Sequence, residues 1–133
     1  MPRAYHIDLA QHVAGADARW VDNLISRFAL PGVEGTGRGS SRRLTASALH
    51  HIALIRSLTD ELGLTASAAV SVAHSLLSSA DETDLAVGPW VRISFQRAEF
   101  IRHVDALIAD GVESISPTRR GRPPGSRPSA IKR

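Results

Sequence analysis

The sequence predicts a mainly α fold that contains two short β elements and ends in a basic tail. Apolar side chains recur every three or four residues in five stretches, which is the spacing of one buried helix face. Four glycines, at positions 32, 35, 37 and 39, separate the second stretch from the third, and a helix interior does not tolerate that density. The 133 residues suffice for one domain with a single core plus appendages.

Residues 7–28 predict two short helices joined by a tight turn. The helical spacing breaks at Ala14-Gly15-Ala16, and Asp17 can cap the second helix by accepting a backbone N–H bond. Two helices around a glycine turn form the arrangement of a helix-turn-helix. One face of the second helix carries side chains that can bond to base edges and phosphates in a major groove: Arg19, Asn23, Ser26 and Arg27. The solvated face of an ordinary helical hairpin fits the same pattern, and the sequence leaves both interpretations open.

The glycine-rich segment 31–44 predicts a loop or a short β-hairpin. A flexible hairpin tipped with Arg38 and closed by Ser41, Arg42 and Arg43 suits a wing that rests on the DNA backbone. The segment lacks the lysine of a GxxxxGK[ST] phosphate loop and follows a helix where a nucleotide fold needs a strand. Nucleotide binding is therefore not expected.

Two longer helices follow this segment. Thr45 caps the first, which Gly63 stops, and Thr65 caps the second. Their apolar stripes are expected to form core rather than a ligand pocket.

Residues 85–111 predict a β-hairpin and a final helix. Val91, Ile93 and Phe95 share one face at period two, with Trp90 on the other face of the same strand, and the helix is expected from about Arg97 to Gly111. This unit has more apolar surface than a lone hairpin and helix can bury. We therefore expect it to pack on the first part of the chain or on a second copy, as a homodimer through residues 80–115.

The C-terminal run from Arg119 to Pro128, RRGRPPGSRP, resembles the AT-hook, whose core is Arg-Gly-Arg-Pro. The glycine lets the backbone approach the floor of a DNA minor groove, and narrow A·T tracts attract arginine side chains. The resemblance implies a minor-groove contact by Arg119, Arg120, Gly121, Arg122, Pro123 and Arg127. A plain solvated basic tail is the alternative that the sequence leaves open.

The order of elements over roughly residues 5–79 resembles the DNA-binding domain of MerR-type regulators. Arg42-Arg43-Leu44-Thr45 matches that family's Arg-Arg-aromatic-Ser/Thr junction, with leucine for the aromatic, and Leu62-Gly63-Leu64-Thr65 matches its Leu-Gly-Phe-Ser/Thr turn. The resemblance implies that the helix with Arg19 and Asn23 reads the major groove while Arg42 and Arg43 hold the backbone. The family's long dimerisation helix is replaced by residues 84–111, and the cysteines of its metal-sensing members are missing.

The expected fold class is therefore mainly α: a winged helix-turn-helix with a small wing hairpin, a β-hairpin plus helix, and a disordered basic tail. These parts correspond to residues 1–79, 80–115 and 116–133. The charge distribution agrees with this division. Residues 1–58 carry seven basic and four acidic side chains, and residues 59–116 carry three basic and nine acidic ones. Residues 117–133 carry six basic side chains and no acidic one. The basic ends suit nucleic acid, and the acidic middle does not.

Double-stranded DNA is the expected partner, and a bacterial transcriptional regulator that binds specific sites is the expected function. An architectural or recombination accessory protein has the same sequence basis, and an antitoxin or adaptor that acts through the acidic segment is a further alternative. An enzyme is not expected, since no paired carboxylates or Ser-His-Asp order stands out. The six scattered histidines and the lack of cysteine argue against a metal site, so no cofactor is expected. The chain has no signal-like or membrane-spanning apolar run, and a cytoplasmic, nucleoid-associated location is expected.

Overall fold

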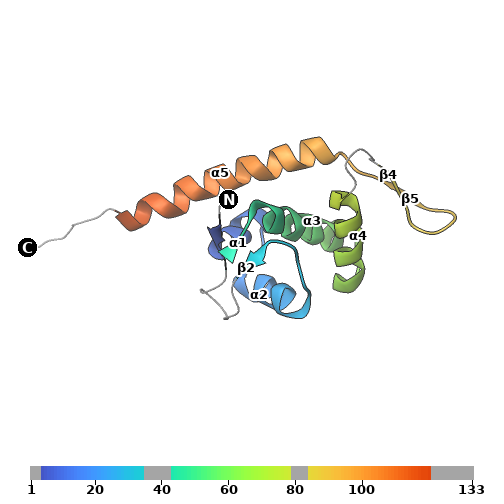
Figure 1. Ribbon diagram of the computed structural model, residues 1–133, viewed down its shortest axis with the longest axis horizontal. Coiled ribbons are helices and arrows are strands. Elements are labelled where there is room, and N and C mark those ends of the chain that lie inside the picture. The colour runs from blue at the N-terminus through green and yellow to red at the C-terminus, as the bar shows by residue number, and fades with distance from the viewer. Residues whose placement is uncertain (1–3, 35–42, 79–83, 121–133) are drawn as a thin grey trace, which may run out of the picture.

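The computed structural model describes residues 4–34, 43–78 and 84–120, and side chains as far as residue 113. Within these ranges the chain forms helices and two small antiparallel sheets, so the prediction of a mainly α fold is confirmed (Figure 1). The helices are α1 (Asp8–Ala14), α2 (Ala18–Arg27), α3 (Ala46–Leu62), α4 (Ala66–Ser78) and α5 (Arg97–Arg120). The strands are β1 (Tyr5–His6), β2 (Val33–Glu34), β3 (Arg43–Leu44), β4 (Asp84–Ala86) and β5 (Arg92–Ser94).

The predicted turn between the first two helices is confirmed. α1 ends at Gly15, whose φ of 65° lies in the left-handed region that glycine adopts without strain. The carboxylate of Asp17 accepts a hydrogen bond of 2.8 Å from the backbone N–H of Trp20 and so caps α2. α2 therefore leaves the turn in a fixed direction.

A three-stranded sheet in the order β1-β3-β2 closes one end of this helix pair. The pairing places Leu44 between Tyr5 and Val33, and its side chain is completely buried. Gly32 enters β2 with a φ of 85°, and a Cβ at this position would collide with the Thr45 hydroxyl. The sequence did not predict β1, because two residues are too few to display a period-two pattern.

The central helix of the molecule is α3, which contacts α1, α4 and α5. The predicted caps are confirmed: Thr45 and Thr65 accept hydrogen bonds from the backbone N–H groups of Ala48 and Ala68, and Gly63 ends α3 with a φ of 70°. The apolar side chains of α3 are buried over most of its length, as expected for a core helix, and they include Leu49, Ile52 and Ile55.

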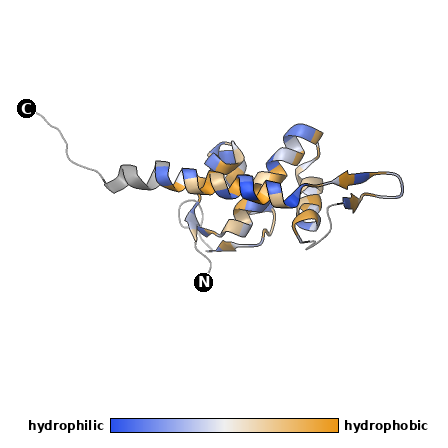
Figure 2. Cartoon of the chain, turned by 90° about the horizontal axis from the view of Figure 1, so that it is seen from above, coloured by the Kyte–Doolittle hydropathy of each residue, from blue (hydrophilic) through white to orange (hydrophobic). Residues whose placement is uncertain are grey.

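The last helix, α5, lies across α1 and α3 (Figures 1 and 2). The prediction that it ends at Gly111 is wrong, because the helix continues to Arg120. Gly111 is not a stop signal here. A Cβ at this position would collide with Leu9 and His12 of α1, so the glycine allows the two helices to approach closely. The disordered tail predicted from residue 116 is likewise wrong for residues 116–120, which are helical.

The predicted hairpin is confirmed as β4 and β5, which pair antiparallel with Leu85 opposite Ile93. Trp90, however, does not lie on a strand face as predicted. It belongs to the turn, which projects away from the helices, and 91% of its surface is exposed (Figure 1). The hydrophobic core also includes Phe95, Val104 and Ile108, so residues on both sides of position 79 share one core.

Candidate nucleic-acid interface

The exposed face of α2 carries the four side chains that the sequence assigned to DNA contact. Successive helix residues are turned by about 100°, which places these four within an arc of roughly 100°. All four are exposed: Arg19, Asn23, Ser26 and Arg27. The opposite side of α2 is buried in the core through Val21, Leu24 and Ile25. α2 thus presents two guanidinium groups, an amide and a hydroxyl on one side of a helix that is anchored on the other.

Arg56 of α3 holds the first turn of α2. Its guanidinium lies over the Trp20 ring, 4.9 Å from the ring centre, and its Nε lies 3.1 Å from the Asp60 carboxylate one helical turn away. A cation over an indole face is attractive, and the ion pair keeps the guanidinium in place. Sequence reasoning missed this contribution, although the spacing of Arg56 and Asp60 was a visible signal for the pair.

The three-stranded sheet contributes Arg43, which is exposed on the central strand. Its cross-strand neighbours are Glu34 on β2 and His6 on β1. A carboxylate opposite an arginine offsets part of its charge, so this edge is less positive than the sequence run of arginines suggests. The remaining predicted wing residues, Arg38, Ser41 and Arg42, lie outside the described residues.

The predicted tail contact starts inside a helix. The backbone of Arg119 and Arg120 forms the last turn of α5, so these two residues belong to a helix and not to the disordered tail predicted from residue 116. Gly121, Arg122, Pro123 and Arg127 lie outside the described residues.

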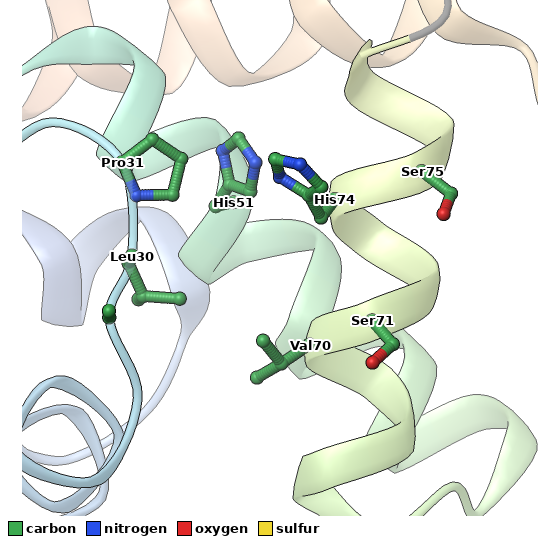
Figure 3. Close-up of a pocket in the computed structure, with 8 residues that line it drawn as sticks. Leu30, Pro31, His51, Val70, Ser71, His74 and Ser75 are labelled. Atoms are coloured by element: carbon green, nitrogen blue, oxygen red, sulfur yellow. The ribbon is translucent and has the colours of Figure 1, made fainter.

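A groove separate from these residues opens between α4 and the segment that follows α2 (Figure 3). Its volume is about 430 Å³, and its apolar walls include Leu30, Pro31 and Val70. His51 of α3 and His74 of α4 stand side by side in it, with ring centres 6.0 Å apart. Sequence reasoning treated these histidines as structural and did not predict the groove, because its walls come from three separate segments.

The environment of His51 in this groove changes the pKa of its imidazole. Burial lowers the pKa of His51 below its usual value, and the nearby His74 and His50 lower it further, against the opposing effect of its hydrogen bond to the Ser47 carbonyl. The neutral imidazole is therefore favoured at neutral pH. Such a ring can accept one hydrogen bond and donate another.

Among residues 4–34, 43–78 and 84–120, no three or more His, Asp or Glu side chains gather as a metal site would require. None of the helices in these ranges is long and apolar enough to cross a membrane. Comparison with family models, with curated proteins and with solved structures finds no match for this chain.

Proposed function

We propose that this chain is a sequence-specific DNA-binding protein that acts as a transcriptional regulator. In this proposal α1, the Gly15 turn and α2 form a helix-turn-helix, and β2, β3 and the segment between them form its wing. The observation that carries the proposal is the exposed polar face of α2, where Arg19, Asn23, Ser26 and Arg27 lie opposite a fully buried apolar side. Arginine and asparagine are the side chains that make bidentate contacts with guanine and adenine in the major groove.

The fixed orientation of α2 supports the same proposal. A reading helix must keep its position relative to the rest of the domain, because base contacts depend on short distances. The Asp17 cap and the Arg56 contact with Trp20 restrain the first turn of α2, and the first turn of a recognition helix is the part that meets base edges. Arg43 on β3 would lie against the phosphate backbone, and the tail from Gly121 onward would add an A·T-biased minor-groove contact.

Selection of bound fragments from random duplexes, followed by fluorescence anisotropy, tests this function. We expect an enriched sequence, and we expect Arg19→Ala combined with Asn23→Ala to weaken binding to it by at least about 30-fold, since each good base contact contributes about 1–3 kcal/mol of discrimination and the double variant loses two. Arg102→Ala is the matched control, because it removes one exposed arginine from α5. It should change the affinity less than threefold.

Three other outcomes separate the alternatives. Equal losses in the double variant and the control would mean that charge alone drives binding. Tight binding with DNA bending but without an enriched sequence would favour an architectural or recombination accessory protein. Failure of the wild-type chain to bind any duplex would contradict the proposal and favour an interaction module, for which the exposed turn around Trp90 is the supporting observation.

A further inference from the structure

The turn of the β4–β5 hairpin exposes an apolar knob, which we define as Val87, Trp90 and Val91. Their exposed fractions are 43%, 91% and 55%. The backbone N–H of Val87 donates a 2.7 Å hydrogen bond to the carbonyl of Val91, so the knob is displayed on a closed turn. Tryptophan is highly buried on average in folded proteins, and exposed apolar clusters mark interaction sites. An indole N–H is also a donor without acceptor capacity.

The groove around His51 contains a buried hydrogen-bond acceptor that needs a donor. His51 is only 6% exposed, and its Nδ1 lies 2.9 Å from the Ser47 carbonyl oxygen. A carbonyl can only accept, so Nδ1 carries the proton and Nε2 is left as an acceptor. Nε2 is buried and has no hydrogen-bond partner among the described residues. A buried polar atom in this state is costly unless a donor reaches it.

We propose that the knob of one molecule docks into the His51 groove of a second copy of this chain, where the indole N–H of Trp90 donates to Nε2 of His51. The exchange is reciprocal, so that two knobs fill two grooves about a two-fold axis. The proposal goes beyond DNA binding and does not depend on it. A dimer of this kind would nonetheless present two copies of α2 to a palindromic site.

Three features favour a second copy as the occupant. The knob supplies a donor and apolar surface, and the groove offers the unpartnered Nε2 acceptor of His51 beside apolar walls. α4 lines the groove and also contacts β4, so the groove and the base of the hairpin are adjacent and can belong to one self-complementary surface about a two-fold axis. The turn of the hairpin projects away from the helices (Figure 1), whereas the groove lies between α4 and the segment that follows α2, so we expect the knob to reach the groove of another molecule rather than its own.

The exposed side chain of His74 lies beside the His51 ring, and it must turn aside for the indole to enter. Exposed side chains change rotamer in picoseconds to nanoseconds, so this movement is no barrier. Each indole can bury about 150–250 Å² of its surface. Two knobs with their grooves therefore approach the lower end of the 1,200–2,000 Å² range of stable interfaces, and we expect a weak dimer.

The test measures the fluorescence of Trp90 itself and needs no DNA. In a Trp20→Phe chain, Trp90 is the sole tryptophan, and its emission should shift to shorter wavelength as protein concentration rises from about 1 µM to 1 mM. Sedimentation equilibrium should show the mass doubling over the same range. Trp90→Ser should abolish the dimer, whereas Arg92→Ala, on the same hairpin, should leave it unchanged. A mass that stays monomeric, a dimer whose emission does not shift, or growth beyond two copies would overturn the proposal.

The hydrogen bond itself has a separate test. In the full chain, Trp90→Phe keeps an aromatic ring but loses the N–H, and His51→Leu keeps an apolar side chain but loses the acceptor. Each substitution removes both hydrogen bonds of the reciprocal dimer, so each should weaken the dimer about 30-fold, as expected for two net hydrogen bonds of about 1 kcal/mol each. The two together should weaken it no more than either alone, and additive losses would overturn the assigned bond. Thermal unfolding shows whether each variant folds. If His51→Leu does not fold, the effect of Trp90→Phe on the dimer is the test of the hydrogen bond.

Discussion

The β4–β5 hairpin and α5 are neighbours in the sequence and both carry apolar side chains, yet they are buried to very different extents. α5 places Val104 and Ile108 in the core, where they are 1% and 6% exposed. The hairpin buries only part of its base and leaves Trp90 to solvent. Apolar content therefore does not decide burial here. A helix can lay a whole stripe of side chains along α1 and α3, whereas the turn of a two-stranded hairpin points away from any surface that its base contacts.

This difference separates a structural role from a binding role. α5 completes the core of the helices that precede it, so changes in α5 should affect stability. The hairpin turn contributes little to the folded monomer, and its apolar side chains are available to a partner. A result in which the hairpin turn stabilises the monomer, or in which α5 does not, would contradict this assignment of roles.

The largest expected contrast is between Ile108→Ala and Trp90→Ala. Truncation of Ile108 removes buried methylene groups and leaves a cavity, so it should lower the free energy of unfolding by about 2–5 kcal/mol. Trp90→Ala should change it by less than about 0.5 kcal/mol, since surface substitutions usually fall within that range. Urea denaturation at about 1 µM protein, where the weak dimer is dissociated, measures both. Similar losses in the two variants would contradict the division between α5 and the hairpin.

A smaller effect is expected at the closest approach of α5 to α1. Gly111→Leu places a side chain where Leu9 and His12 already lie, and overpacking of this kind costs about 1–3 kcal/mol. Ala109→Leu places the same leucine side chain on the exposed side of the same helix and serves as the control. Its effect on the free energy of unfolding should be close to zero. A Gly111→Leu chain as stable as the control would show that α5 does not pack on α1 at this point.

Local structure was predicted correctly where a single residue type marks the start or the end of a helix. Asp17, Thr45 and Thr65 cap helices as expected, and Gly15 and Gly63 end them. The predicted helix end at Gly111 was wrong, because glycine, which has no Cβ, is suited both to ending a helix and to allowing two helices to approach closely. Only the position of α1 distinguishes the two, and that position is a property of the tertiary structure.

The candidate sites show the same limit. The periodicity of α2 was enough to place Arg19 and Asn23 on an exposed face, because the buried residues of the helix are strongly apolar. The His51 groove could not be predicted, since its walls come from three segments that lie about twenty residues apart in the sequence. The exposure of Trp90 depends on where the hairpin turns, and a shift of the turn by one residue changes the face on which a side chain lies.

The smallest predicted effect concerns the polar contacts at the edges of α5. Asp105 lies 2.8 Å from His50 of α3, and the His50 side chain is 16% exposed. Asp105→Asn removes the charge but keeps an oxygen that accepts hydrogen bonds, so it should lower the free energy of unfolding by no more than about 1 kcal/mol. Where the His50 imidazole is protonated, the loss should shrink in about 1 M NaCl, because salt screens the ion pair. Asp84→Asn, the same change on the exposed end of β4, is the matched control and should have no effect at either salt concentration. A loss that is equal in low and high salt would mean that Asp105 stabilises the fold through its hydrogen bond to His50 rather than through its charge.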